Sequence, residues 1–134
     1  MNERLAGLMR RLGICEERGS GFDKAMIAIE TSQLPAPEIR LDSSHTHVVL
    51  FAHRNLTKGD RPARVRACYI HACLRYVSGQ EMTNTSLRER FKLEEKDYTT
   101  ASKILRETAA AKLIKPADAA SKSKKYARYV PFWA

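Results

Sequence analysis

The 134-residue sequence predicts an α+β fold, and three observations favour this class. Apolar residues recur at helical spacing in several stretches, and short stretches typical of strands follow the helices in each half of the chain. Hydrophobic residues make up 43% of the chain, which is enough to build a core. The length suits one domain or two small modules. No apolar run approaches the ~20 residues that cross a bilayer, so the composition argues against an integral membrane protein.

Two helices are predicted at the start of the chain. The first carries an apolar stripe at i, i+3, i+4 and i+7, formed by Leu5, Leu8, Met9 and Leu12. Gly13 follows as a suitable C-terminal cap, and a glycine-containing loop spans residues 16–21. The second helix has one apolar side, formed by Phe22, Met26 and Ile29. It should stop before Leu34-Pro35, because the residue before a proline disfavours helical backbone.

A β-hairpin is predicted after these helices. Residues 39–41 alternate like a strand, residues 42–44 (Asp-Ser-Ser) are typical of a turn, and residues 48–51 (Val-Val-Leu-Phe) predict a buried strand. Residues 53–62 are polar and contain Pro62, which indicates a linker. We therefore expect two modules, residues 1–60 and 61–134.

The charge distribution supports the same border. Residues 1–60 contain eight Lys/Arg and eight Asp/Glu, whereas residues 61–134 contain sixteen and seven and carry the whole net charge of +9. An excess of positive charge confined to one half of the chain favours a polyanionic partner for that half, and nucleic acid is the commonest such partner. The alternative is a basic surface that is simply solvated.

The order of elements in residues 61–134 predicts a winged helix-turn-helix, preceded in residues 1–60 by the helix-helix-β-hairpin segment. The expected order is a buried helix over 63–77, a short helix through Phe91 with cap candidates in residues 83–85 (Thr-Asn-Thr), a tight turn over 92–95, and a helix over 96–112. A strand over 113–115, a polar loop over 116–125 and a strand over 126–133 follow. The helix over 96–112 should bury one face, formed by Ala101, Ile104, Leu105 and Thr108.

The opposite face of that helix is predicted to contact duplex DNA. A recognition helix lies in a major groove about 12 Å wide and needs short polar or cationic side chains there. The outward positions hold such side chains: Lys96, Thr99, Thr100, Ser102, Lys103 and Arg106. The hairpin loop and returning strand add cations suited to phosphates: Lys122, Lys124, Lys125 and Arg128. A winged helix used only for protein contact is the competing interpretation.

Residues 101–106 and 113–114 resemble the recognition helix and first wing strand of winged-helix transcription regulators. That pattern usually has glycine before the Leu-Ile pair, and this chain has Lys112 there. The turn must therefore be made in another way.

A second resemblance covers nearly the whole chain. Residues 2–6 (NERLA), 12–13, 16–23 (EERGSGFD) and 34–38 (LPAPE) are similar to the end of the GHKL-type ATP-binding module of bacterial RecG-like regulators, which are often labelled ATP-dependent DNA helicase RecG-related. Residues 64–74, 82–84, 87–91 and 129–134 (YVPFWA) are similar to the C-terminal segment of the same proteins. The resemblance implies a transcription regulator and a C-terminal fragment of a longer, cytoplasmic protein.

The nucleotide chemistry of that family is not expected in this chain. Gly19, Ser20 and Gly21 open a helix, and their backbone amides are the one candidate for holding a phosphate; a plain glycine turn is the alternative. The family's ATP modules also need an Asn and a Glu on an early helix and an Asp-containing loop, which nothing before Gly19 supplies. No P-loop motif is present. We expect no cofactor and no ATP hydrolysis here, with ATP a ligand of the parent protein; a fragment of a helicase-related enzyme is the alternative.

No catalytic or metal site is predicted. On a helix, Cys73 turns away from Cys68 and His71, which argues against three-point metal ligation and for buried core cysteines. The odd count of three cysteines, without a CxxC pair, favours a reducing compartment. His45 and His47 are expected at an exposed strand end.

The remaining candidates are a serine and two aromatic residues. A serine nucleophile at position 20, 86 or 102 needs a base, and no histidine spacing indicates one. Phe132-Trp133 could stack on a nucleic-acid base, but we expect it to pack on the core or on another domain.

Overall fold

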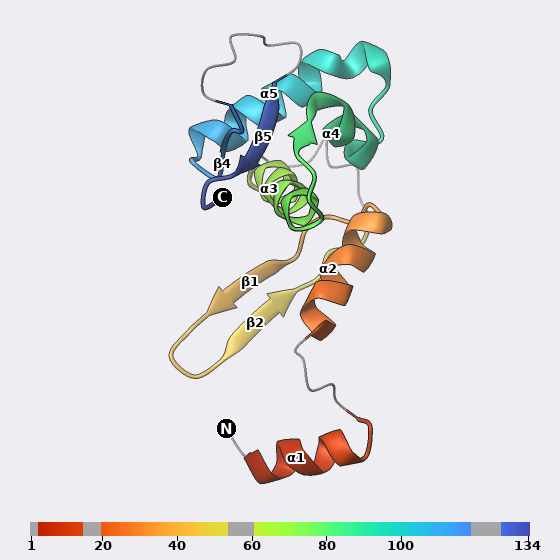
Figure 1. The fold of residues 1–134 in the computed structure, drawn as a ribbon, viewed down its shortest axis with the longest axis vertical. Helices are drawn as coiled ribbons and strands as arrows, with labels where there is room; N and C mark the ends of the chain where they lie inside the picture. The colour runs from red at the N-terminus through yellow and green to blue at the C-terminus, as the bar shows by residue number, and fades with distance from the viewer. Residues whose placement is uncertain (1–2, 15–19, 54–60, 119–126) are drawn as a thin grey trace.

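The computed structural model describes residues 3–14, 20–53, 61–118 and 127–134, and it has the predicted α+β class. Residues 61–134 build the larger unit, from α3 (Arg61–Val77), β3 (Met82–Thr83), α4 (Asn84–Phe91), the 3-10 turn η1 (Glu95–Asp97), α5 (Tyr98–Ala110), β4 (Ile114–Pro116) and β5 (Arg128–Pro131). The three strands form an antiparallel sheet in the order β3-β5-β4. In Figure 1, α3 lies beneath α5 and β5, while α4 lies at the side.

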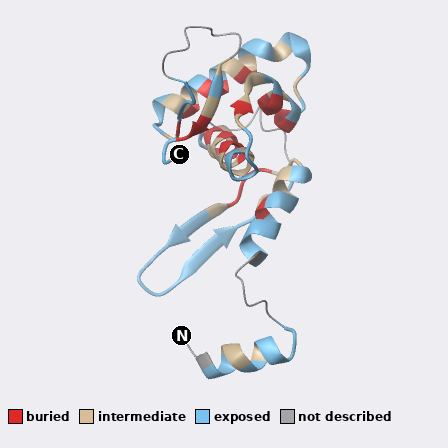
Figure 2. Cartoon of the chain, viewed as in Figure 1, coloured by how far each residue is buried: buried red, intermediate tan, exposed pale blue. Residues whose placement is uncertain are grey.

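The hydrophobic core lies almost entirely in this larger unit (Figure 2). Its buried members come from α3, β3, α4, α5 and β4: Ala67, Cys68, Ala72, Met82, Leu87, Phe91, Ala101, Ile104, Leu105 and Ile114. The predicted inward face of α5 is confirmed, since Ala101, Ile104, Leu105 and Thr108 are all buried. One residue from the N-terminal half, Ala36, joins the same cluster.

The N-terminal half supplies α1 (Glu3–Arg11), α2 (Ser20–Thr31) and the antiparallel hairpin of β1 (Glu38–Leu41) and β2 (Thr46–Val49). Figure 1 shows the hairpin projecting away from the larger unit and α1 at the far end of the molecule. The expectation that residues 48–51 form a buried strand is wrong: every residue of β2 is exposed (Figure 2). A two-stranded hairpin buries its apolar residues only when another helix or sheet packs against it. None of the described residues covers the β1–β2 hairpin in this way.

Several element boundaries also differ from expectation. The long C-terminal helix begins at Tyr98 and not at Lys96, because residues 95–97 form a 3-10 turn in which the Glu94 amide donates to the Asp97 carboxylate over 3.2 Å. The last strand spans Arg128–Pro131 and is shorter than the predicted 126–133. Among the described residues, no helix has the length and apolar character needed to traverse a lipid bilayer.

All five α-helices in the described residues end with one arrangement, the Schellman motif. A residue with positive φ follows the helix, its amide donates to the carbonyl three residues earlier, and the next amide donates to the carbonyl five residues earlier. The positive-φ residues are Gly13, Gln33, Gly79, Lys92 and Lys112. The glycine that the wing pattern usually carries is thus replaced by Lys112, which takes the left-handed conformation itself at φ 57°.

Replacing Lys112 with glycine is expected to raise the free energy of unfolding by about 1 kcal/mol. A side chain in the left-handed region costs roughly 1–2 kcal/mol, and glycine avoids most of that cost. Chemical denaturation of the full chain measures the change. Lys112→Ala is the matched control, because it removes the amine but keeps the strained Cβ and should give no gain. Equal stabilisation by alanine and glycine would contradict the backbone explanation.

Candidate nucleic-acid interface

The exposed face of α5 brings together part of the predicted DNA-contacting set. Thr99, Lys103 and Arg106 are exposed, and Thr100 and Ser102 are half-buried. Helical spacing places them opposite the buried residues that anchor α5 to the core. The described residues of the N-terminal half leave this face open, since the side chains of Thr99, Lys103 and Arg106 remain exposed in their presence.

Hydrogen bonds between α4 and α5 fix the setting of this face. The side-chain amide of Asn84 donates to Ser102 Oγ at 3.0 Å and to the Tyr98 carbonyl at 3.3 Å. Arg88 Nε donates to Asn84 Oδ1 at 3.1 Å, so the guanidinium of Arg88 lies next to the start of α5. Ser102 therefore positions α5, and Arg88 is a cation near the face that the sequence analysis missed. Its i, i+4 spacing from Asn84 is the signal that could have found it.

The predicted wing is only partly described. Lys122, Lys124 and Lys125 lie outside the described residues. Arg128 begins β5 and is exposed, with its Nη1 atom 3.1 Å from the Glu81 carboxylate. Lys96, expected on the recognition face, lies in η1 and pairs with Glu94 at 2.7 Å.

The glycine loop of the N-terminal half gives little geometric support for phosphate binding. Gly19 lies outside the described residues, and Ser20 is the first residue of α2. Gly21 has no heavy atom within 4 Å of the position where a Cβ would lie, and its φ is not in the left-handed region. The backbone at Gly21 therefore does not require glycine.

A buried polar network that no sequence pattern predicted links α2 to α3 and α4. One carboxylate oxygen of Glu30 lies 2.5 Å from His71 Nδ1, and the other accepts a hydrogen bond from Arg90 Nε at 2.6 Å. Arg90 Nη2 also donates to the Leu34 carbonyl at 2.6 Å. The side chain of Arg90 is only 2% exposed, so its charge depends on these acceptors. The partners lie 41 and 60 residues from Glu30, beyond the reach of any spacing pattern.

The same network corrects the expectation that no histidine serves Ser86. His71 Nε2 lies 3.1 Å from Ser86 Oγ, which completes a Ser-His-Glu chain with Glu30. However, Ser86 is 3% exposed, and its hydroxyl donates to the Thr83 carbonyl and accepts from the Thr83 amide in the capping box of α4. A nucleophile must reach its substrate, so this buried hydroxyl serves the helix cap.

The cysteines of α3 lie in an apolar setting. Cys68 is fully buried with its sulfur 3.9 Å from that of Met82, and burial raises the pKa of its thiol to about 12. Cys73 is only half-buried and lies outside the core cluster, so the expectation of a buried core cysteine is wrong for it; desolvation raises its thiol pKa as well. Both ring nitrogens of His71 face Glu30 and Ser86. No group of three or more potential metal ligands occurs among the described residues.

His45 and His47 lie at the tight turn between β1 and β2, next to Asp42. The Asp42 carboxylate accepts hydrogen bonds from the amides of Ser44 and His45 at 3.0 and 2.9 Å, which lower the pKa of Asp42. His47 Nε2 lies 3.2 Å from the same carboxylate. The histidines are exposed, as expected, and the turn geometry accounts for the cluster.

The C-terminal aromatic pair contacts α3 but does not join the core as expected, since Phe132 is 53% and Trp133 49% exposed. Trp133 Nε1 donates to the Tyr69 hydroxyl at 3.2 Å, and its ring meets Tyr76 edge-on at 5.3 Å between centroids. Phe132 lies against Tyr69 at 6.4 Å. These contacts hold the two rings against the side of α3 and leave about half of each exposed.

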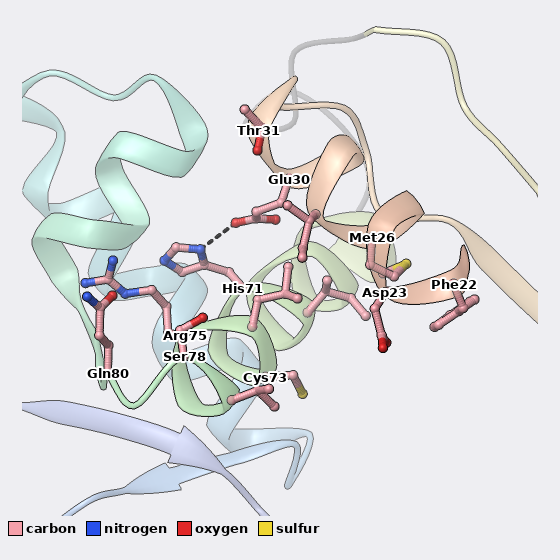
Figure 3. Close-up of a pocket in the computed structure, with 14 residues that line it drawn as sticks. Phe22, Asp23, Met26, Glu30, Thr31, His71, Cys73, Arg75, Ser78 and Gln80 are labelled. Atoms are coloured by element: carbon pink, nitrogen blue, oxygen red, sulfur yellow. Dashed lines mark hydrogen bonds and ion pairs between the residues drawn. The ribbon is translucent and has the colours of Figure 1, made fainter. Parts of the chain in front are cut away.

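A cavity of about 740 Å³ lies between α2 and α3 (Figure 3). Its walls are mainly apolar, and the Glu30–His71 pair lies between its two ends. No pattern in the sequence indicates this cavity, because it arises from two helices whose packing the sequence pattern does not specify.

Comparison with known proteins gives a family match for the N-terminal part of the chain. Residues 1–50 match the family model described as "Putative ATP-dependent DNA helicase recG C-terminal". This supports similarity of the N-terminal half to a RecG-related, ATP-dependent helicase region, in line with the resemblance seen in the sequence. No curated protein and no solved structure matches the chain.

Proposed function

We propose that residues 61–134 form a winged helix that binds duplex DNA through α5, as part of a RecG-related transcription regulator. The observation that carries the proposal is the open face of α5, where Thr99, Lys103 and Arg106 are exposed while the opposite side is anchored in the core. The helix-turn-helix order of α4 and α5, followed by β4 and β5 in one sheet with β3, supports it. The net charge of +9 in this half supplies attraction to phosphates.

In this mechanism α5 enters the major groove and the flanking cations hold the backbone. Lys103 and Arg106 reach base edges or phosphates, and the hydroxyls of Thr99 and Thr100 add shorter contacts. Ser102 acts through Asn84 to keep α5 at its angle to α4. Arg128 and the wing lysines Lys122, Lys124 and Lys125 contact phosphates beside the groove. The partner is duplex DNA.

A helicase-related enzyme is the second candidate, because the family match covers residues 1–50. Titration with MgATP separates the two. Amide chemical shifts that move at Gly21 and Phe22 at the start of α2 would favour the enzyme, whereas unchanged shifts together with DNA binding would favour the regulator module.

A salt titration of duplex binding tests the proposal directly. About five phosphate contacts predict that log Kobs falls against log salt concentration with a slope of roughly −4 to −5. Fluorescence anisotropy of a labelled pool of random-sequence duplexes measures the slope. Absence of binding at ~50 mM salt, where phosphate contacts are strong, would reject the proposal.

A further inference from the structure

We propose that the cavity between α2 and α3 binds a small monoanionic amphiphile, namely a carboxylate attached to an apolar body. The inference is independent of DNA binding. It rests on the size of the cavity, its apolar wall and the lining residue Arg75, whose buried Nε atom has no hydrogen-bond partner among the described residues.

The size and lining of the cavity fit a small molecule. Its volume of about 740 Å³ lies within the ~300–1,000 Å³ common for ligand pockets. The wall is apolar along both helices, with Met26 and Ile27 contributed by α2 and Leu74 and Val77 by α3. An aliphatic or aromatic body would remove this surface from water, which is the main source of affinity in such sites.

The cation at one end of the cavity is Arg75. Its Nε atom is buried and has no hydrogen-bond partner among the described residues, and no ion pair joins Arg75 to any of them. Arg75 as a whole is half-buried, but a buried N–H donor without an acceptor is costly, so this end of the cavity is complementary to an anionic acceptor. Figure 3 shows Arg75 beside Ser78 and Gln80, at the end of the cavity away from Phe22. The hydroxyl of Ser78 and the amide of Gln80 are further donors for a carboxylate.

The acidic residue between the two ends does not satisfy Arg75. Both carboxylate oxygens of Glu30 are engaged, one with His71 and the other with Arg90. Asp23 lines the opposite end, near Phe22 (Figure 3). The anionic group of a ligand therefore faces Arg75 and its apolar body extends toward α2.

Calorimetric titration of the full chain with decanoate tests the assignment. We expect saturable binding at one site, with acetate and decanol each binding at least tenfold more weakly because one lacks the apolar body and the other lacks the charge. Arg75→Met should lower the affinity for decanoate about ten- to a hundredfold, the value of a charge-assisted hydrogen bond, and Arg75→Lys should restore part of it. Ile27→Glu, at an exposed position, should also weaken binding by placing a like charge near the ligand.

Two variants keep the result interpretable. Arg61→Met removes a cation from the exposed start of the same helix and should leave decanoate affinity unchanged. Equal binding of decanoate and decanol, equal affinity of wild type and Arg75→Met, or no saturable binding by the wild type would each overturn the proposal. Analytical sedimentation gives one more outcome that would overturn the proposal: the ligand-free chain sediments as a dimer, and Ile27→Glu dissociates that dimer. The cavity wall would then be an interface between two copies of the chain.

Discussion

Replacing Glu30 with alanine is expected to lower the free energy of unfolding by about 3 kcal/mol, the largest single effect anticipated in this chain. The substitution removes an acceptor that lies 2.6 Å from Arg90 Nε and 2.5 Å from His71 Nδ1. Arg90 then keeps only the Leu34 carbonyl for a guanidinium whose side chain is 2% exposed. An uncompensated buried charge costs far more than a lost surface pair.

A double-mutant cycle distinguishes this cause from simple loss of packing. Glu30→Ala/Arg90→Met removes the charge together with its acceptor and should recover at least half of the lost stability, as measured by urea denaturation. Glu38→Ala is the matched control: it breaks the pair with Arg40, whose side chain is 71% exposed, and should cost at most about 0.5 kcal/mol. Additive effects of the two network substitutions would show that the buried charge is not the cause.

The double substitution Lys103→Ala/Arg106→Ala is expected to weaken duplex binding at least thirtyfold at low salt. Each residue that contacts a base or phosphate contributes about 1–3 kcal/mol, and both side chains are exposed, so the fold should be unaffected. Anisotropy titration at constant salt measures the affinity. Selection from a random duplex pool measures specificity, and the variant should lose any sequence that the wild type enriches.

The control for this experiment removes two positive charges from a part of the chain outside α5. Arg10→Ala/Arg40→Ala deletes two exposed cations from the N-terminal half and should change duplex affinity less than threefold. If both double variants weaken binding equally, net charge and not the face of α5 is responsible. If neither weakens it, α5 does not contact DNA.

Local patterns in the sequence predicted the helices well because the signals act over a few residues. The inward face of α5 was predicted from spacing alone. Three cap candidates were predicted for α4, residues 83–85, and the structure selects Thr83, whose hydroxyl accepts a hydrogen bond from the Ser86 amide at 3.1 Å. The burial of residues 48–51 was predicted wrongly. An apolar run shows that a strand has side chains suited to burial, but it does not show whether another part of the protein packs against that strand.

The missed features of the site all depend on distant residues. Glu30, His71 and Arg90 come from three helices, and only the packing of α2 against α3 and α4 brings them together. The cavity beside them has the same origin. The left-handed conformation of Lys112 was also beyond prediction, since lysine has no preference for it and the helix end imposes it.

The short segment Leu34–Pro37 determines where the polypeptide could be divided. Ala36 is 2% exposed within the core of the larger unit, its carbonyl accepts from Arg66 at 3.4 Å, and the Leu34 carbonyl accepts from Arg90. Residues 61–134 excised alone would keep their own helices but lose these acceptors together with the carboxylate of Glu30. A truncation that starts ahead of α2 retains all of them, so limited proteolysis should release a stable piece beginning there and not at the charge boundary.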